Sequence, residues 1–278
     1  MEIVQIHRSR IARVWTDRDF ENMPYIPGGA GIPDQWETDA RSYREVEHAI
    51  GRARLNQSYG PAERQALDLF LPAGKPEGLV VFVHGGYWIR FDRSYSSHLA
   101  RGAQQRGWAV AIPSYTLAPQ ARISEITSEI ACALTHAAGL VAGPIVVTGH
   151  SAGGHLSGRM ACRDVHLPLE VEKRLQRIVP ISPVADLRPF IGLTMNDDFR
   201  LTPQEAAAES LVLASSRRDL PVTIWVGAEE RPVFLDQAIA LNKAWESSCL
   251  RVATGCHHMD IIDGLTDPDS PLTASLFC

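Results

Sequence analysis

The chain has 278 residues, of which 45% are hydrophobic and 21% are charged, as in a folded globular protein rather than a disordered or fibrous one. Its 27 Lys and Arg against 32 Asp and Glu give a net charge of -5, and no dense basic cluster favours nucleic acid as a partner. At about 150 residues per domain, this length suits one large domain with an extension.

The length of the apolar runs and the spacing of the cysteines indicate in which cellular compartment the protein is found. Runs such as 79–83 are strand-sized, whereas a membrane span needs about 20 apolar residues. Residues 1–10 alternate charged and apolar side chains, without the apolar segment of a secretory signal. The five cysteines include no Cys-x-x-Cys pair, which favours reduced thiols over a disulfide framework or a zinc ribbon. We therefore expect a cytoplasmic protein that has no contact with membranes.

Residues 1–60 are interpreted as an N-terminal extension. They are rich in charge, Pro and Gly, and their aromatic residues follow neither the helix nor the strand period. A short helix is expected over 42–54. We favour a segment packed on the main body; the alternative is a cover over the active site, in which residues 23–27 add apolar wall.

From residue 61 to 278 the pattern is that of a single α/β domain. Short apolar runs rich in β-branched residues alternate with segments of helical character. The expected strands are 66–71, 79–84, 108–113, 145–148, 178–181, 222–226 and 250–253, and the expected helices lie near 94–106, 123–138, 152–162 and 232–247. Such alternation predicts a doubly wound, mostly parallel sheet. Residues of about 183–220 interrupt it, and we expect a small insertion there with a helix beginning at Thr202.

The motif Gly149-His-Ser-Ala-Gly153 lies directly between a predicted strand and a predicted helix. A serine on such a tight turn is held in a strained conformation with its hydroxyl projecting from the sheet edge, and small flanking residues are needed because a Cβ would collide. Ser151 is therefore the candidate nucleophile, whereas the alternative is a glycine-rich turn with a surface serine. His150 and His155 are interpreted as packing residues beside the turn.

A second motif, His84-Gly-Gly-Tyr-Trp88, follows the apolar strand 79–83. Paired glycines can simply form a turn, but they also let backbone N–H groups approach a developing oxyanion. With the N–H of Ala152, those of Gly85 and Gly86 would complete an oxyanion hole. A phosphate-binding loop is disfavoured because neither glycine-rich phosphate motif is present.

A serine nucleophile needs a base that is itself oriented by an acid. His257 and His258 follow the last predicted strand, and Glu229 and Glu230 follow the strand before it. Both pairs lie at carboxyl ends of strands, where open parallel sheets place their sites. The residues alone choose neither between the histidines nor among Glu230, Glu229 and Asp186 for the acid.

With these features the chain resembles the α/β-hydrolase superfamily and, within it, the arylformamidases (kynurenine formamidases) and related esterases. The resemblance covers about residues 58–265. Its motifs are Tyr59-Gly-Pro61, Leu67-Asp-Leu-Phe70, the two motifs above, Ser182-Pro-Val-Ala-Asp-Leu-Arg-Pro189, Glu230-Arg-Pro-Val-Phe-Leu-Asp-Gln237 and His258-Met-Asp-Ile261. The resemblance implies the α/β-hydrolase fold, with the insertion after its sixth strand.

Carried over to matching positions, the resemblance implies Ser151 as nucleophile, His258 as base and Glu230 as acid, at a position where many formamidases carry aspartate. Tyr87 and Trp88 are then expected to line the leaving-group side of the substrate site. The implied function is cleavage of a carboxylic amide or ester through an acyl-enzyme, most like an arylformamidase acting on N-formylkynurenine in tryptophan catabolism. The alternative is a small-acyl carboxylesterase; a non-catalytic binding protein ranks below both because all three triad positions are filled.

This chemistry needs no cofactor, and no metal is expected. A metal site built from His257, His258 and Asp260 is discounted because adjacent histidines on one loop cannot easily converge on one ion. The expected partner is a small-molecule ester or aryl-formamide substrate, and a homodimer is compatible with the sequence.

Overall fold

The computed structural model describes residues 15–217 and 219–278. The strands are β1 Ala53–Ser58, β2 Ala66–Phe70, β3 Leu79–Val83, β4 Ala109–Pro113, β5 Ile145–His150, β6 Leu175–Ile181, β7 Val222–Gly227 and β8 Ser248–Ala253. The α-helices are α1 Asp17–Phe20, α2 Ile32–Ala49, α3 Arg101–Gln105, α4 Ile123–Leu140, α5 Ala152–Arg159, α6 Leu169–Glu172, α7 Asn196–Phe199, α8 Pro203–Glu209, α9 Pro232–Ala244 and α10 Pro271–Ser275. Short 3₁₀ turns lie at Met23–Tyr25, Gly29–Gly31, Arg93–Tyr95, Ser97–Ala100, Arg188–Gly192, Leu211–Leu213 and Asp263–Thr266.

The strands form one eight-stranded sheet in the order β1-β2-β4-β3-β5-β6-β7-β8. The pairs β1/β2 and β2/β4 are antiparallel, and every later pair is parallel. The prediction of an α/β fold with a doubly wound, mostly parallel sheet is therefore confirmed. Because the central strands run the same way, their carboxyl ends meet at one edge of the sheet, where β3, β5, β7 and β8 each lead into a predicted site segment.

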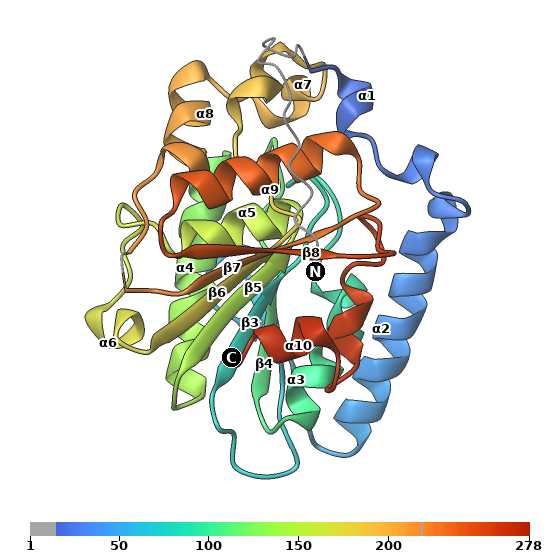
Figure 1. Cartoon of the computed structure of the whole chain (residues 1–278). Coiled ribbons are helices and arrows are strands. Elements are labelled where there is room, and N and C mark those ends of the chain that lie inside the picture. Colours follow the sequence, from blue (N-terminus) through green and yellow to red (C-terminus); the bar gives the residue numbers. More distant parts are fainter. Residues whose placement is uncertain (1–14, 218) are drawn as a thin grey trace.

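Helices cover both faces of this sheet (Figure 1). Side chains of β3 alternate between the faces: Val81 belongs to the apolar cluster that includes side chains of α4, α5 and α9, whereas Phe82 belongs to the cluster that includes side chains of α2, α3 and α10. Both faces of the central strands are thus buried, which explains why these strands read as nearly continuous apolar runs.

The first strand of the sheet lies inside the segment predicted as an extension. Residues 42–54 were expected to be helical, but the helix α2 is Ile32–Ala49, and Gly51, with φ +72°, separates it from β1. β1 is an edge strand that buries little besides Ala53, so its polar sequence lacks the apolar signal of the inner strands. The expected helix over 94–106 is also shorter, because 3₁₀ turns precede α3.

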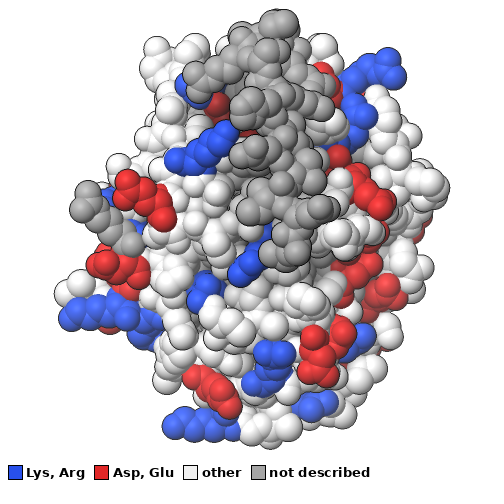
Figure 2. Space-filling view, viewed as in Figure 1, with Lys and Arg blue, Asp and Glu red and all other residues white. Residues whose placement is uncertain are grey.

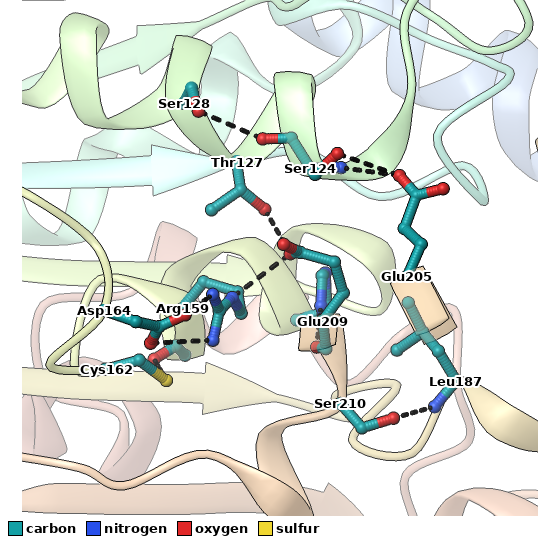
Figure 3. Close-up of polar contacts among 12 residues, drawn as sticks. Ser124, Thr127, Ser128, Arg159, Cys162, Asp164, Leu187, Glu205, Glu209 and Ser210 are labelled. Atoms are coloured by element: carbon teal, nitrogen blue, oxygen red, sulfur yellow. Dashed lines mark hydrogen bonds and ion pairs between the residues drawn. The ribbon is translucent and has the colours of Figure 1, made fainter. Parts of the chain in front are cut away.

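The insertion at about 183–220 contains α7 and α8, and α8 begins as predicted, with Thr202 accepting a hydrogen bond from the N–H of Glu205. A buried polar network fastens it to the main body (Figure 3). Glu209 accepts hydrogen bonds from Thr127 of α4 at 2.7 Å and from Arg159 of α5 at 3.1 Å. The insertion is therefore attached to the helix that begins at the candidate nucleophile.

On the face in Figure 2, Lys and Arg side chains lie among Asp and Glu, so the described residues form no large patch of one charge there. Among the helices of the described residues, none is both long and apolar enough to cross a membrane. The five cysteines are free, and burial raises the pKa of the Cys162 thiol to about 12.

Candidate active site

Ser151 stands between β5 and α5 in a strained conformation, with φ 56° and ψ -114°. The side chain is buried, and its backbone N–H donates to the carbonyl of Ile181 on β6 at 2.9 Å. Non-glycine residues with positive φ persist where the surrounding structure requires them, and they concentrate at functional sites. The turn predicted from the sequence is thus present at Ser151.

The flanking glycines are required by space. A Cβ on Gly149 would lie 2.3 Å from the carbonyl oxygen of Gly153, and a Cβ on Gly153 would lie 2.0 Å from that of Val83. Both distances are shorter than any real contact, so only glycine allows β5, α5 and the end of β3 to approach this closely.

His258 and Glu230 form a buried pair beside this turn. Nδ1 of His258 lies 2.7 Å from Oε2 of Glu230, and both side chains are almost completely enclosed. The other carboxylate oxygen, Oε1, accepts the backbone N–H of Gly227 at 2.8 Å and the hydroxyl of Ser182. Because Nδ1 faces the carboxylate, the proton of a neutral His258 belongs there, and Nε2 is left to accept a proton.

The rival residues lie elsewhere. Glu229 is exposed, and Asp186 pairs with Arg188 at 2.6 Å. His257 is engaged in its own turn: its backbone N–H donates to the carboxylate of Asp260 at 2.8 Å, and its ring Nδ1 accepts the backbone N–H of Asp260 at 3.2 Å. Among the acids and histidines that the sequence left open, the structure brings together only Glu230 and His258.

His150 has a role beyond the packing expected for it. Its Nε2 lies 2.8 Å from the backbone carbonyl oxygen of His258, which can only accept, so this nitrogen carries the proton. The two rings stand 4.6 Å apart, and burial holds the pKa of His150 well below its ordinary value. A neutral His150 therefore links the turn that carries Ser151 to the loop that carries His258 by a hydrogen bond. The position of His150 directly before Ser151 is the feature of the sequence that could have indicated this contact.

The glycine loop after β3 lies against the nucleophile turn. A Cβ on Gly85 would stand 2.9 Å from the carbonyl oxygen of His150 and 3.2 Å from Cβ of Ser151. Gly86 has φ +101°, and its carbonyl accepts the N–H groups of Ile89 and Arg90, which closes a tight turn. Ala152 is the first residue of α5, so its N–H has no partner within the helix. Gly85 and Ala152 thus lie directly beside Ser151, and Gly86 lines the same cavity.

A cavity of about 350 Å³ joins these elements. Ser151, His258, Gly85, Gly86 and Tyr87 all line it. The remaining wall is largely apolar or aromatic and includes Phe20, Met23, Pro24, Trp36, Phe82, Ile89, Phe91, Met195, Met259 and Ile262. Ligand sites commonly combine such walls with a few convergent polar groups.

Of the N-terminal extension, residues 1–14 lie outside the described residues, and residues 20–24 line the cavity. Met23 and Pro24 supply part of the cavity wall, whereas Tyr25, Ile26 and Pro27 do not. The hydroxyl of Tyr87 donates to the backbone carbonyl of Phe20 at 2.6 Å, which fastens the segment to the glycine loop. The cavity wall therefore combines residues 20–24 with residues of the segment 258–262, which lies far away in the sequence.

Trp88 does not lie on the cavity wall, and this corrects the expectation that it lines the substrate site. Its side chain is completely buried and packs edge-on against His155, Phe190 and Phe199. Tyr87 and Trp88 both have positive φ, so the loop turns between them and sends the larger ring into the core. Within the described residues, no group of three or more His, Cys, Asp or Glu could hold a metal ion.

Comparison with known proteins places these features in a family context. Residues 80–254 match the family described as alpha/beta hydrolase fold. The kynurenine formamidase of Danio rerio is 27% identical over 254 residues, 85% of each chain, and that of Salmo salar is 28% identical over 254 residues, 83% of this chain and 84% of its own. A solved candidate thioesterase from Silicibacter sp. TM1040 is 50% identical with a TM-score of 0.91, covering 94% of this chain and 98% of its own. Esterase B from Lactobacillus rhamnosis, at 18% identity and a TM-score of 0.63 over 88% and 90% of the two chains, shares the fold.

Proposed function

The chain belongs to the alpha/beta hydrolase fold family, whose formamidase and esterase relatives make it a hydrolase, and we propose that it works through a serine nucleophile and an acyl-enzyme. Ser151 is the proposed nucleophile, His258 the base and Glu230 the acid. One observation carries the proposal: a strained, buried serine shares a cavity with a histidine whose far nitrogen is held by a buried carboxylate.

In the first step Ser151 Oγ bonds to the substrate carbonyl carbon while its proton passes to His258 Nε2. Glu230, 2.7 Å from Nδ1, keeps the ring oriented and stabilises the imidazolium. The carbonyl oxygen becomes negative and is met by the backbone N–H groups of Gly85, Gly86 and Ala152. These donors belong to the fixed backbone, so they need little reorganisation as charge develops.

Collapse of the tetrahedral intermediate breaks the bond to the leaving group, which receives the proton from His258. Water then repeats the attack on the acyl-enzyme, giving its proton to His258, and the acid product leaves with Ser151 restored. Every proton in this cycle passes through His258, and the oxyanion donors keep theirs.

For the substrate we propose an aryl formamide such as N-formylkynurenine. Both formamidase relatives above match over more than four-fifths of this chain. The leaving nitrogen of such a substrate is attached to an aromatic ring that delocalises its lone pair, which weakens amide resonance. A cavity of about 350 Å³ is at the small end for ligand sites, and its aromatic wall suits an aryl leaving group.

The second candidate is an esterase for small acyl groups. It is favoured by the solved relative described as a candidate thioesterase, which is the more similar in sequence at 50% identity. Esters and thioesters need the same nucleophile, base and oxyanion donors, so the two candidates differ in the leaving group rather than in mechanism.

The experiment compares kcat/KM for N-formylkynurenine with that for short-chain aryl esters and thioesters, using Ser151→Ala as the blank. We expect the parent to hydrolyse the formamide and the variant to hydrolyse neither class. Turnover of esters alone would reject the formamidase proposal and keep the esterase. Activity of Ser151→Ala close to that of the parent would reject the serine mechanism.

A further inference from the structure

Ser182 occupies a position beside the nucleophile that the reaction described above leaves unused. Strands β5 and β6 are parallel neighbours with His150 opposite Ile181, and Ser151 and Ser182 are the residues that follow them. Each serine has positive φ, 56° for Ser151 and 48° for Ser182, and each is buried. Two adjacent strands thus end in the same strained way.

The strain at Ser182 calls for an explanation in the folded protein. A non-glycine residue in this region is disfavoured by contact between its Cβ and the backbone, and it persists where neighbouring structure determines it. The N–H of Ser182 donates to the carbonyl of Trp225 on β7 at 2.7 Å. This bond fixes the serine over the end of β7, the strand that leads to Glu230.

From there the hydroxyl of Ser182 donates to Oε1 of Glu230. The N–H of Gly227 donates to the same oxygen at 2.8 Å, whereas Oε2 faces Nδ1 of His258 at 2.7 Å. One carboxylate oxygen is therefore anchored by two donors, and the other is directed at the imidazole. Hydrogen bonds to a buried charged group are among the stronger ones in proteins.

Two anchors matter because a glutamate carries one more rotatable bond than an aspartate, and its terminal torsion is broad. The N–H of Gly227 alone fixes one direction of the carboxylate, and the hydroxyl of Ser182 supplies a second direction from another strand. We propose that Ser182 is a positioning residue that holds Glu230 toward His258, an inference that rests on the proposed triad.

The first test removes the hydroxyl in two ways. Ser182→Ala keeps a Cβ in the strained backbone, whereas Ser182→Gly also relieves the strain. We expect both variants to lower kcat for an aryl ester about tenfold with KM nearly unchanged, the size expected for one hydrogen bond to a charged group. Recovery of parental kcat in Ser182→Gly would show that only the backbone matters and would overturn the proposal.

The second test asks whether Ser182 acts through Glu230. In a Glu230→Gln background the residual rate is measured above the Ser151→Ala blank, either as ester turnover or as the rate of inactivation by an alkyl fluorophosphonate. We expect Ser182→Ala to change that rate by less than about twofold, because the group that it positions is gone. A further tenfold fall in this background would assign Ser182 a separate role and overturn the inference.

Ser157→Ala is the matched control, because Ser157 is also buried and its hydroxyl donates to a backbone carbonyl, that of Gly154, at 2.9 Å. We expect this variant to lose stability without losing kcat. Full activity of Ser151→Ala would defeat the proposed function, whereas a large loss in Glu230→Gln with none in Ser182→Ala would defeat the positioning role alone.

Discussion

A methyl group at Gly85 perturbs the proposed oxyanion loop without changing any side chain of the proposed triad. The added Cβ would lie 2.9 Å from the carbonyl oxygen of His150 and 3.2 Å from Cβ of Ser151. Ordinary contacts need roughly 0.5 Å more, and both neighbours belong to the rigid turn between β5 and α5, so the loop must move away. Oxyanion donors act within 2.7–3.1 Å, and loss of one costs about 3 kcal/mol of transition-state stabilisation.

We therefore expect Gly85→Ala to lower kcat for an aryl ester about a hundredfold, with a small change in KM. The assay is steady-state hydrolysis, with urea unfolding to show that the variant is folded. Gly139→Ala is the control, because a Cβ on Gly139 meets nothing within 4 Å and alanine favours the helix α4. A kcat of Gly85→Ala within twofold of the parent would refute the assignment of this loop.

Two further predictions concern stability. Burial lowers the pKa of His84 to about 4 and that of His155 to about 3, so below about pH 6.5 the unfolded chain binds more protons and stability falls toward pH 4. We expect His155→Gln to reduce the slope of the free energy of unfolding against pH by up to about 1.4 kcal/mol per pH unit, as measured by urea titrations across this range. An unchanged slope would contradict the lowered pKa of His155. Arg159→Met leaves Glu209 buried without its cation and should cost about 3–5 kcal/mol in urea unfolding. Arg188→Met removes an exposed arginine from the half-buried Asp186 and should cost less than about 1 kcal/mol. Equal losses for the two arginine variants would show that burial does not set the difference.

The central strands could be predicted because burial on both faces leaves them few residue types. Val81 and Phe82 point to opposite faces and are both apolar, so the sequence around them has no competing interpretation. The sequence of β1 has no continuous apolar run. Only Ala53 of this edge strand is buried, and pairing with β2 rather than its own pattern makes it a strand.

The site was predictable where the backbone alone demands a residue type. The glycines around Ser151 are required because an added Cβ would lie less than 3 Å from a backbone atom. These glycines are close together in the sequence, so they form a recognisable motif. The hydrogen bond between Glu230 and Ser182 gives no such motif, because the two residues follow different strands, β7 and β6, and are far apart in the sequence. Trp88 shows the same limit: two consecutive residues with positive φ decide whether an aromatic ring faces the cavity or the core, and composition does not reveal that choice.

The central claim is that Ser151 carries the acyl group during turnover. Acid quenching of the protein during hydrolysis of an activated aryl acetate, followed by peptide mass spectrometry, tests it directly. We expect an acetyl group on the peptide that contains Ser151, enriched in the quenched sample and absent from Ser151→Ala. Steady hydrolysis with no acyl group on Ser151, or with one on another residue that is required for turnover, would contradict it.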